Sequence, residues 1–199
     1  NGSQLHAFTS DSHTLPKGWA GFDVGNLTRP GVSRYESETF TLRADGQGFG
    51  ETEDHFHSTY RIPSGDFSLA CRVDFLNPTG PSTRSGLSVR MSGSSGSPHV
   101  TLLTTAAGEL WLVSRMQENG RAIFERVAGD GLSLPIYLKL EREKESIRAS
   151  YSSDGNHWNT VGTKHLLVNT PLAVGLVTTS GETLKRTVTR FSQVNLLEK

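Results

Sequence analysis

The stretch from 49 to 60, FGETEDHFHSTY, holds the residues whose types and spacing could do chemistry. His55 and His57 stand two positions apart, so in a strand both imidazoles would lie on one face. Two imidazoles on one face can contribute to a zinc site, but a tetrahedral site requires further ligands. The rest of the sequence shows no pattern that would supply them. We therefore predict neither a metal site nor a cofactor.

Three carboxylates precede these histidines and raise the question of glycoside hydrolysis, which requires two carboxylates held at a set separation across a cleft. Glu51 and Glu53 would share one side of a strand, while Asp54 would point to the other side. A Gly-x-Ser-x-Gly nucleophile elbow is absent. The single cysteine, Cys71, falls on the apolar face of a predicted strand, which is typical of a packed thiol. We assign no catalytic residue.

Short alternating segments separated by turn residues are the elements that must position these side chains. The segment 66–76 alternates as a strand with one buried face does, and its apolar positions are Phe67, Leu69, Cys71, Val73 and Phe75. Asn-Gly and Asp-Gly pairs, which are strong hairpin signals, separate several such segments. No window shows a sustained helical period. We expect strands at 38–44, 54–61, 66–76, 84–92, 99–105, 109–116, 121–127, 135–143, 146–152, 157–163, 171–178 and 186–197.

This pattern predicts an all-β fold, a two-sheet antiparallel β-sandwich that occupies residues 1–199 as a single domain. A chain of 199 residues is long enough to bury a sizeable core. The alternation places the following residues in that core: Phe67, Leu69, Val73, Leu87, Val89, Leu110, Leu112, Leu138, Leu140, Val174 and Leu176.

Several motifs occur in the order of a known pattern, and together they extend from about Gly18 to Phe191. They are Asp54-x-Phe56-His57-x-x-Tyr60, Ser64-Gly65-Asp66, Gly86-Leu87-Ser88-Val89-Arg90, Tyr137-Leu138-Lys139-Leu140-Glu141-Arg142, Tyr151-Ser152-Ser153-Asp154-Gly155-x-x-Trp158 and Val174-Gly175-Leu176. In this respect the chain resembles the concanavalin A-like domains called "regulation of enolase protein" domains, found in bacterial secreted and polysaccharide-degrading proteins. The resemblance implies a lectin-like jelly roll and suggests glycan binding.

Alternation also suggests a binding face. Trp111 and Arg115 share one side of their strand, and Arg90 lies on the polar side of another. If His57 and Arg61 lie on the same sheet surface, the five side chains form a concave ligand-binding site. An indole ring can cover the apolar face of a pyranose, while arginine and histidine bind hydroxyls or a carboxylate. The alternative is that these polar side chains are only cross-strand neighbours on a solvated sheet.

Composition restricts the partners. The formal net charge is zero, which argues against a general affinity for nucleic acid. No apolar run approaches the roughly 18 residues of a membrane span. We therefore expect an oligosaccharide or polysaccharide partner, and a secreted or periplasmic location, with a cytoplasmic one as the alternative.

Three functions remain open at this point. The first is a non-catalytic, lectin-like carbohydrate-binding module associated with polysaccharide degradation. The second is a glycoside hydrolase of the same fold with unidentified carboxylates. The third is an intracellular protein-interaction domain. The sequence favours the first, because it shows no catalytic constellation.

Overall fold

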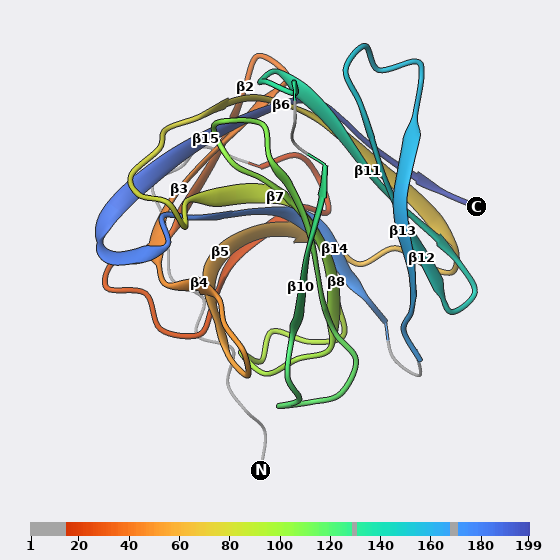
Figure 1. Ribbon diagram of the computed structural model, residues 1–199, viewed down its shortest axis with the longest axis horizontal. Coiled ribbons are helices and arrows are strands. Elements are labelled where there is room, and N and C mark those ends of the chain that lie inside the picture. Colours follow the sequence, from red (N-terminus) through yellow and green to blue (C-terminus); the bar gives the residue numbers. More distant parts are fainter. Residues whose placement is uncertain (1–14, 129–130, 168–170) are drawn as a thin grey trace.

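The computed structural model describes residues 15–128, 131–167 and 171–199. These residues form two antiparallel β-sheets packed face to face, which confirms the predicted all-β sandwich (Figure 1). Every regular element in the described ranges is a strand. These ranges contain no helix that is long and apolar enough to cross a membrane.

The first sheet has eight strands, whose bounds are β1 Ala20–Val24, β4 Gly48–Phe49, β5 Asp54–Arg61, β7 Arg84–Arg90, β8 His99–Thr104, β9 Leu110–Arg115, β10 Ile123–Ala128 and β14 Ala173–Thr179. They pair in the order β1-β5-β14-β7-β8-β9-β10, and β4 pairs with the beginning of β5. In Figure 1, β5 is a strongly curved strand that bends around the centre of the molecule.

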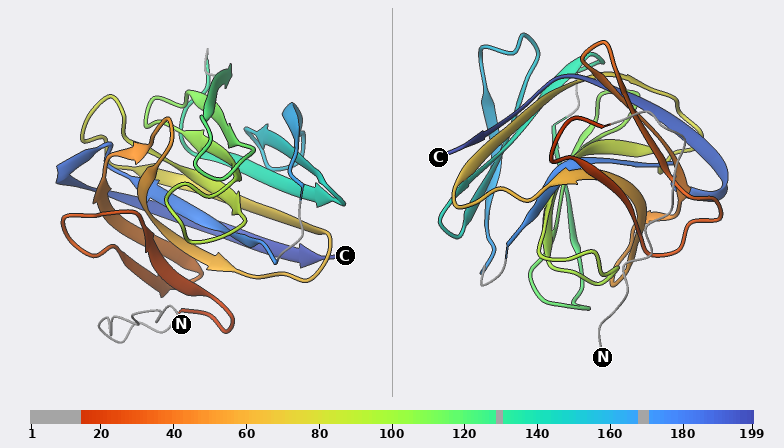
Figure 2. Two further views of the ribbon diagram at one scale, coloured as in Figure 1. Left: turned by 90° about the horizontal axis from the view of Figure 1, so that it is seen from below. Right: turned by 180° about the vertical axis from the view of Figure 1, so that it is seen from behind.

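The second sheet has seven strands, whose bounds are β2 Val32–Glu36, β3 Thr39–Gly46, β6 Phe67–Leu76, β11 Ile136–Glu143, β12 Ser146–Ser152, β13 Asn159–His165 and β15 Glu182–Glu198. They pair in the order β13-β12-β11-β6-β15-β3-β2. The long strands of both sheets run along a common direction, as in an aligned sandwich (Figure 2).

The core lies between the two sheets and consists of the inward-facing positions of both. Every core residue predicted by alternation is buried, with at most 1% of its surface exposed. Cys71 also belongs to this core, and burial raises the pKa of its thiol. Trp19 covers one margin of the core, with its ring centroid 5.0 Å from that of Phe40.

Phe75 departs from the predicted alternation and is 41% exposed. The reason is an irregularity in the pairing of β6 with β15, where Arg190 pairs with Phe75 but the next residue, Phe191, pairs with Val73. Such a bulge reverses the facing of the residues beyond it. Phe75 therefore lies on the solvent-facing side beside Arg190, whose guanidinium carbon is 5.2 Å from the ring centroid.

The turn between β2 and β3 consists of two residues in the left-handed region. Ser37 has φ 48° and Glu38 has φ 60°, while the flanking residues Glu36 and Thr39 pair directly. Positive φ at both positions is the requirement of a type I′ hairpin turn, which ordinarily selects Asn-Gly. This turn positions β2, which the sequence reasoning did not predict.

We expect Glu38→Gly to stabilise the protein by about 0.5–1 kcal/mol. Glycine removes the strain of the left-handed backbone, and this gain exceeds the cost of the greater entropy that glycine gives the unfolded chain. For a chain of this size, that gain corresponds to a rise of about 1–4 °C in the melting temperature. Glu36→Gly is the matched control: it changes the same residue type within β2 and should lower the melting temperature. A lower melting temperature for Glu38→Gly would contradict the strain argument.

Candidate functional site

Three of the five predicted ligand-binding residues lie on the outer face of the eight-stranded sheet, the face turned away from the core. Trp111 and Arg115 alternate along β9 with the core residues Leu110 and Leu112. Arg90 ends β7 on the same side, and it reaches the same carboxylate as Arg115. The predicted facing of these three residues is correct.

The arginines of this face bind a carboxylate of the protein itself. Arg115 donates two hydrogen bonds to Asp54, from Nη1 to Oδ2 over 2.7 Å and from Nη2 to Oδ1 over 2.9 Å. Arg90 Nη1 donates a third to Oδ2 over 2.7 Å. Burial alone would raise the pKa of Asp54, but the hydrogen bond from Arg115, together with the charge and hydrogen bond of Arg90, outweighs it and holds the pKa below its ordinary value of 3.8.

The remaining donors of the two guanidinium groups bind the backbone of three loops. Arg115 donates to the carbonyl oxygens of Gly50 and Gly120, each over 3.0 Å, and Arg90 Nη2 donates to that of Ser94 over 2.7 Å. The loops therefore close over this end of the outer face. Only 1% of Arg90 and 0% of Arg115 is exposed, so the structure does not support a direct contact between these guanidinium groups and a ligand.

Trp111 stands at the other end of the same face and is half-buried. The guanidinium carbon of Arg84 lies 4.9 Å from the centroid of its ring, so one side of the indole is already occupied. Its side chain packs against a second apolar cluster, whose buried members are Val24, Phe56, Leu103, Val113, Ala122 and Val177. This face therefore carries a buried apolar cluster where we expected a concave sugar-binding surface.

His57 and Arg61 lie on the opposite side of their strand. The outer face of β5 is made by Asp54, Phe56 and the residues that alternate with them, which turns His57 and Arg61 the other way. Arg61 pairs with Glu198 of β15, with Nη2 3.4 Å from Oε1. The prediction that the five residues share one concave surface is therefore wrong.

His57 is part of a polar chain between the two sheets. Its Nδ1 lies 2.6 Å from Asp23 Oδ1, and its Nε2 lies 2.7 Å from Ser33 Oγ. These distances match those of a serine–histidine–aspartate triad. However, Ser33 Oγ also contacts Thr59 Oγ1, and His57 is only 3% exposed. Because Ser33 belongs to β2 and His57 to β5, we interpret the chain as a link between the sheets and assign no nucleophile.

The backbone encloses this link closely. A Cβ atom at Gly31 would lie 2.2 Å from the ring of His57, so only glycine fits there. In the described parts of the chain, no group of three or more histidine, cysteine or acidic residues is placed to hold a metal ion.

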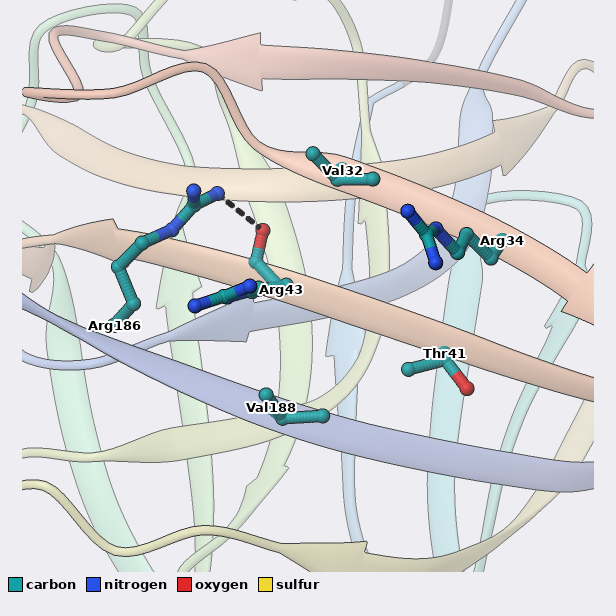
Figure 3. A pocket seen from close by; sticks show the side chains of 6 residues that line it. All are labelled: Val32, Arg34, Thr41, Arg43, Arg186 and Val188. Carbon is teal, nitrogen blue, oxygen red and sulfur yellow. Dashed lines mark hydrogen bonds between the residues drawn. The ribbon is translucent and has the colours of Figure 1, made fainter. Parts of the chain in front are cut away.

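A hollow lies on the solvent-facing side of the seven-stranded sheet and is a further candidate site. It has a volume of about 270 Å³ and is lined by Val32, Arg34, Thr41, Arg43, Arg186 and Val188 (Figure 3). We call it the arginine hollow. Its lining comes from three adjacent strands, β2, β3 and β15, because alternate residues of each strand face solvent there.

The arginine hollow combines an apolar floor with hydrogen-bond donors. Val32 and Val188 pair on either side of Arg43, so the two valines and the stem of this arginine form a continuous surface. In Figure 3 the side chains of Arg43 and Arg186 lie next to each other, and that of Arg34 lies further along β2. Arg34 and Arg43 are both exposed.

Comparisons with known proteins locate the fold. No protein-family profile and no curated protein sequence matches the chain. Among solved structures, a functionally unknown protein from Saccharomyces cerevisiae superposes with a TM-score of 0.70 and 18% identity, covering 90% of this chain and 96% of that one. The similarity is one of fold. The resemblance to the "regulation of enolase protein" domains continues to rest on the sequence motifs alone.

Two further structures of this fold belong to carbohydrate-related proteins. The GH43 protein BlXynB from Bacillus licheniformis superposes with a TM-score of 0.63 and 15% identity, covering 95% of this chain and 38% of that one. The exoplasmic/lumenal domain of VIP36, in its form bound to Ca²⁺ and Man, gives a TM-score of 0.50 and 9% identity over 92% of this chain and 83% of that one. Our chain therefore spans well under half of the length of BlXynB.

Proposed function

We propose that this protein is a non-catalytic carbohydrate-binding module that holds its glycan in the arginine hollow. The observation that carries the proposal is the lining of the hollow, where two valines form an apolar floor beneath three guanidinium groups and a threonine hydroxyl. A pyranose ring has the complementary character, since it presents C–H groups on one face and hydroxyls around its rim. The volume of about 270 Å³ is close to the lower end of the roughly 300–1,000 Å³ typical of small-molecule sites.

The fold supports this proposal without deciding it. The same sandwich occurs in BlXynB, where it corresponds to 38% of a longer GH43 chain, and in the Man-bound domain of VIP36. By analogy, we infer that the module acts beside a polysaccharide-degrading activity outside the cytoplasm. Because the carboxylate of Asp54 is buried and already bound by two arginines, it is not available as a hydrolytic acid.

A glycan array followed by calorimetry tests the proposal. We expect at least one oligosaccharide class to bind and no reducing sugar to be released from it. Exchanging both exposed arginines of the hollow, in the double variant Arg34→Gln/Arg43→Gln, should weaken binding about tenfold or more, because charge-assisted hydrogen bonds are lost.

Arg148→Gln is the matched control. Arg148 lies on β12 of the same sheet, its side chain is 47% exposed, and its ion pair with Glu141 is long, at 3.9 Å. This variant should bind the glycan as the unmodified protein does. Release of reducing sugar, or undiminished binding by the double variant, would contradict a binding module centred on the arginine hollow.

A further inference from the structure

We propose that the arginine hollow selects acidic glycans, specifically those whose sugars carry a carboxylate, as uronic acids do. This inference rests on the proposed function and names the class of ligand. It follows from the balance of charges around the hollow, because the two exposed arginines at the hollow lack carboxylate partners.

Arg34 and Arg43 make no ion pair within the described parts of the chain, although both are placed where a ligand could reach them. Other exposed arginines of this protein do pair with carboxylates. Arg121, for example, lies 3.1 Å from Glu51. The arginine hollow therefore presents guanidinium groups whose donors are not consumed by the protein's own acids.

The third arginine is held in place by the backbone. Arg186 Nη2 donates to the carbonyl oxygen of Pro30 over 2.8 Å and to that of Arg43 over 3.2 Å. Its Nε is buried and has no hydrogen-bond partner among the described residues. Arg186 thus supplies a fixed positive charge at the margin of the hollow.

The surrounding charges do not neutralise this cluster. Burial, followed by the positive charges of Arg43 and Arg29, lowers the pKa of Arg186 and outweighs the opposite effect of Asp45 and Asp23. Both of these acids are engaged elsewhere. Asp45 accepts hydrogen bonds from the backbone amides of Thr28 and Arg29, and Asp23 binds His57.

An anionic group in the hollow would relieve this repulsion. The planar guanidinium group matches a carboxylate in a two-point hydrogen bond, which a hydroxyl cannot reproduce. The apolar floor at Val32 and Val188 favours a carboxylate that is attached to a ring over a free inorganic anion. The positive charge is confined to the arginine hollow, because the whole chain has a net charge of zero. We therefore expect no general attraction to polyanions.

The test compares two probes, oligogalacturonate and its methyl ester, in which the same carboxyl groups are either ionised or uncharged. By calorimetry at low ionic strength, we expect the acid to bind about tenfold or more tightly than the ester, which is the effect of one lost charge-assisted hydrogen bond. Binding of the acid should weaken as salt is raised. Arg43→Lys, which keeps the charge but removes the planar fork, should lose part of the affinity, and Arg148→Gln none.

The outcomes separate this inference from the proposed function. Equal binding of acid and ester, lost in the Arg34→Gln/Arg43→Gln variant, would overturn the acidic specificity and leave a neutral glycan site in the hollow. Tight binding of a sulfated oligosaccharide in place of the uronate would overturn the choice of carboxylate. Unchanged binding of the acid by the double variant would place the acid site elsewhere. Absence of binding to every glycan would overturn both proposals, provided that melting curves show each variant folded.

Discussion

Asp54→Asn should lower the melting temperature by about 6–20 °C. The change keeps the shape of the side chain but removes the charge that two buried arginines share, and Arg90 and Arg115 are 1% and 0% exposed. Removing one partner from a buried ion pair costs about 3–5 kcal/mol, because the remaining charge stays buried without compensation. For a chain of this size, 1 kcal/mol corresponds to about 2–4 °C. Thermal unfolding followed by circular dichroism measures the shift.

Glu51→Gln provides the matched control for this prediction. It also converts a carboxylate to an amide in the neighbouring loop, but Glu51 pairs with Arg121 at the surface, with side chains 70% and 78% exposed. Exposed ion pairs contribute about 0–1 kcal/mol to the free energy of unfolding, so the Glu51→Gln variant should melt at nearly the same temperature as the unmodified protein. If Asp54→Asn melted within 2 °C or so of the unmodified protein, the two arginines would have to be compensated by water or by the loops, and the ion network would not hold this face together.

Asp54 also shows where sequence reasoning reached its limit. Alternation correctly placed Arg90 and Arg115 on the polar side of their strands, because facing is a local property of the chain. Their partner was not predictable in the same way. Asp54 lies 36 residues from Arg90 and 61 residues from Arg115, so alternation within one strand cannot pair them. β14 lies between β5 and β7, and β9 lies further along the same sheet, so the contact depends on the arrangement of the whole sheet.

The arginine hollow was not predicted from the sequence, for a different reason. Within 38–44 and 186–197, alternation puts Arg43 and Arg186 on the polar sides of their strands, a signal from which our sequence analysis derived no site. The third side is β2, and its hairpin turn at Ser37 and Glu38 lacks the glycine by which such turns are recognised. The order of strands, which makes β2, β3 and β15 neighbours, depends on pairing across more than 140 residues.

Core positions were predictable because their burial follows from period two alone, and this rule failed only where the period broke. Phe75 shares the predicted apolar face of 66–76 with Val73, but the bulge opposite Arg190 reverses its facing. Leu76 occupies the buried position in its place, at 2% exposure. A bulge depends on the partner strand, so the sequence of β6 by itself does not reveal it.

The second large effect concerns pH, and it originates at His99. Burial, together with the positive charges of Arg90 and Arg115, outweighs the attraction of Asp54 and lowers the pKa of His99 from 6.5 to about 3. The contacts of the ring agree with a neutral imidazole. Its Nδ1 lies 2.9 Å from Thr101 Oγ1, while its Nε2 is buried without a hydrogen-bond partner among the described residues.

A histidine with a lowered pKa in the folded state destabilises that state in acid. Between pH 6.5 and about 3, the unfolded chain binds a proton at His99 that the folded chain does not bind. The contribution of His99 is therefore fully retained above pH 6.5 and is lost as the pH falls, with a slope of about 1.4 kcal/mol per pH unit. The pKa of Asp54 is lowered as well, so its contribution is present above about pH 4 and is lost only below that value.

Urea unfolding between pH 7 and pH 4.5 isolates the effect of His99, because Asp54 remains ionised throughout this range. We expect the free energy of unfolding to fall steeply in the unmodified protein and much less in His99→Asn, whatever the stability of that variant at pH 7. His157 has the opposite effect on the pH dependence of stability, because its hydrogen bond with Asp154 raises its pKa. His157→Asn should therefore be combined with both the unmodified protein and the His99→Asn variant. An equal slope with and without His99 would mean that the imidazole is already protonated in the folded state, as a third cation around Asp54.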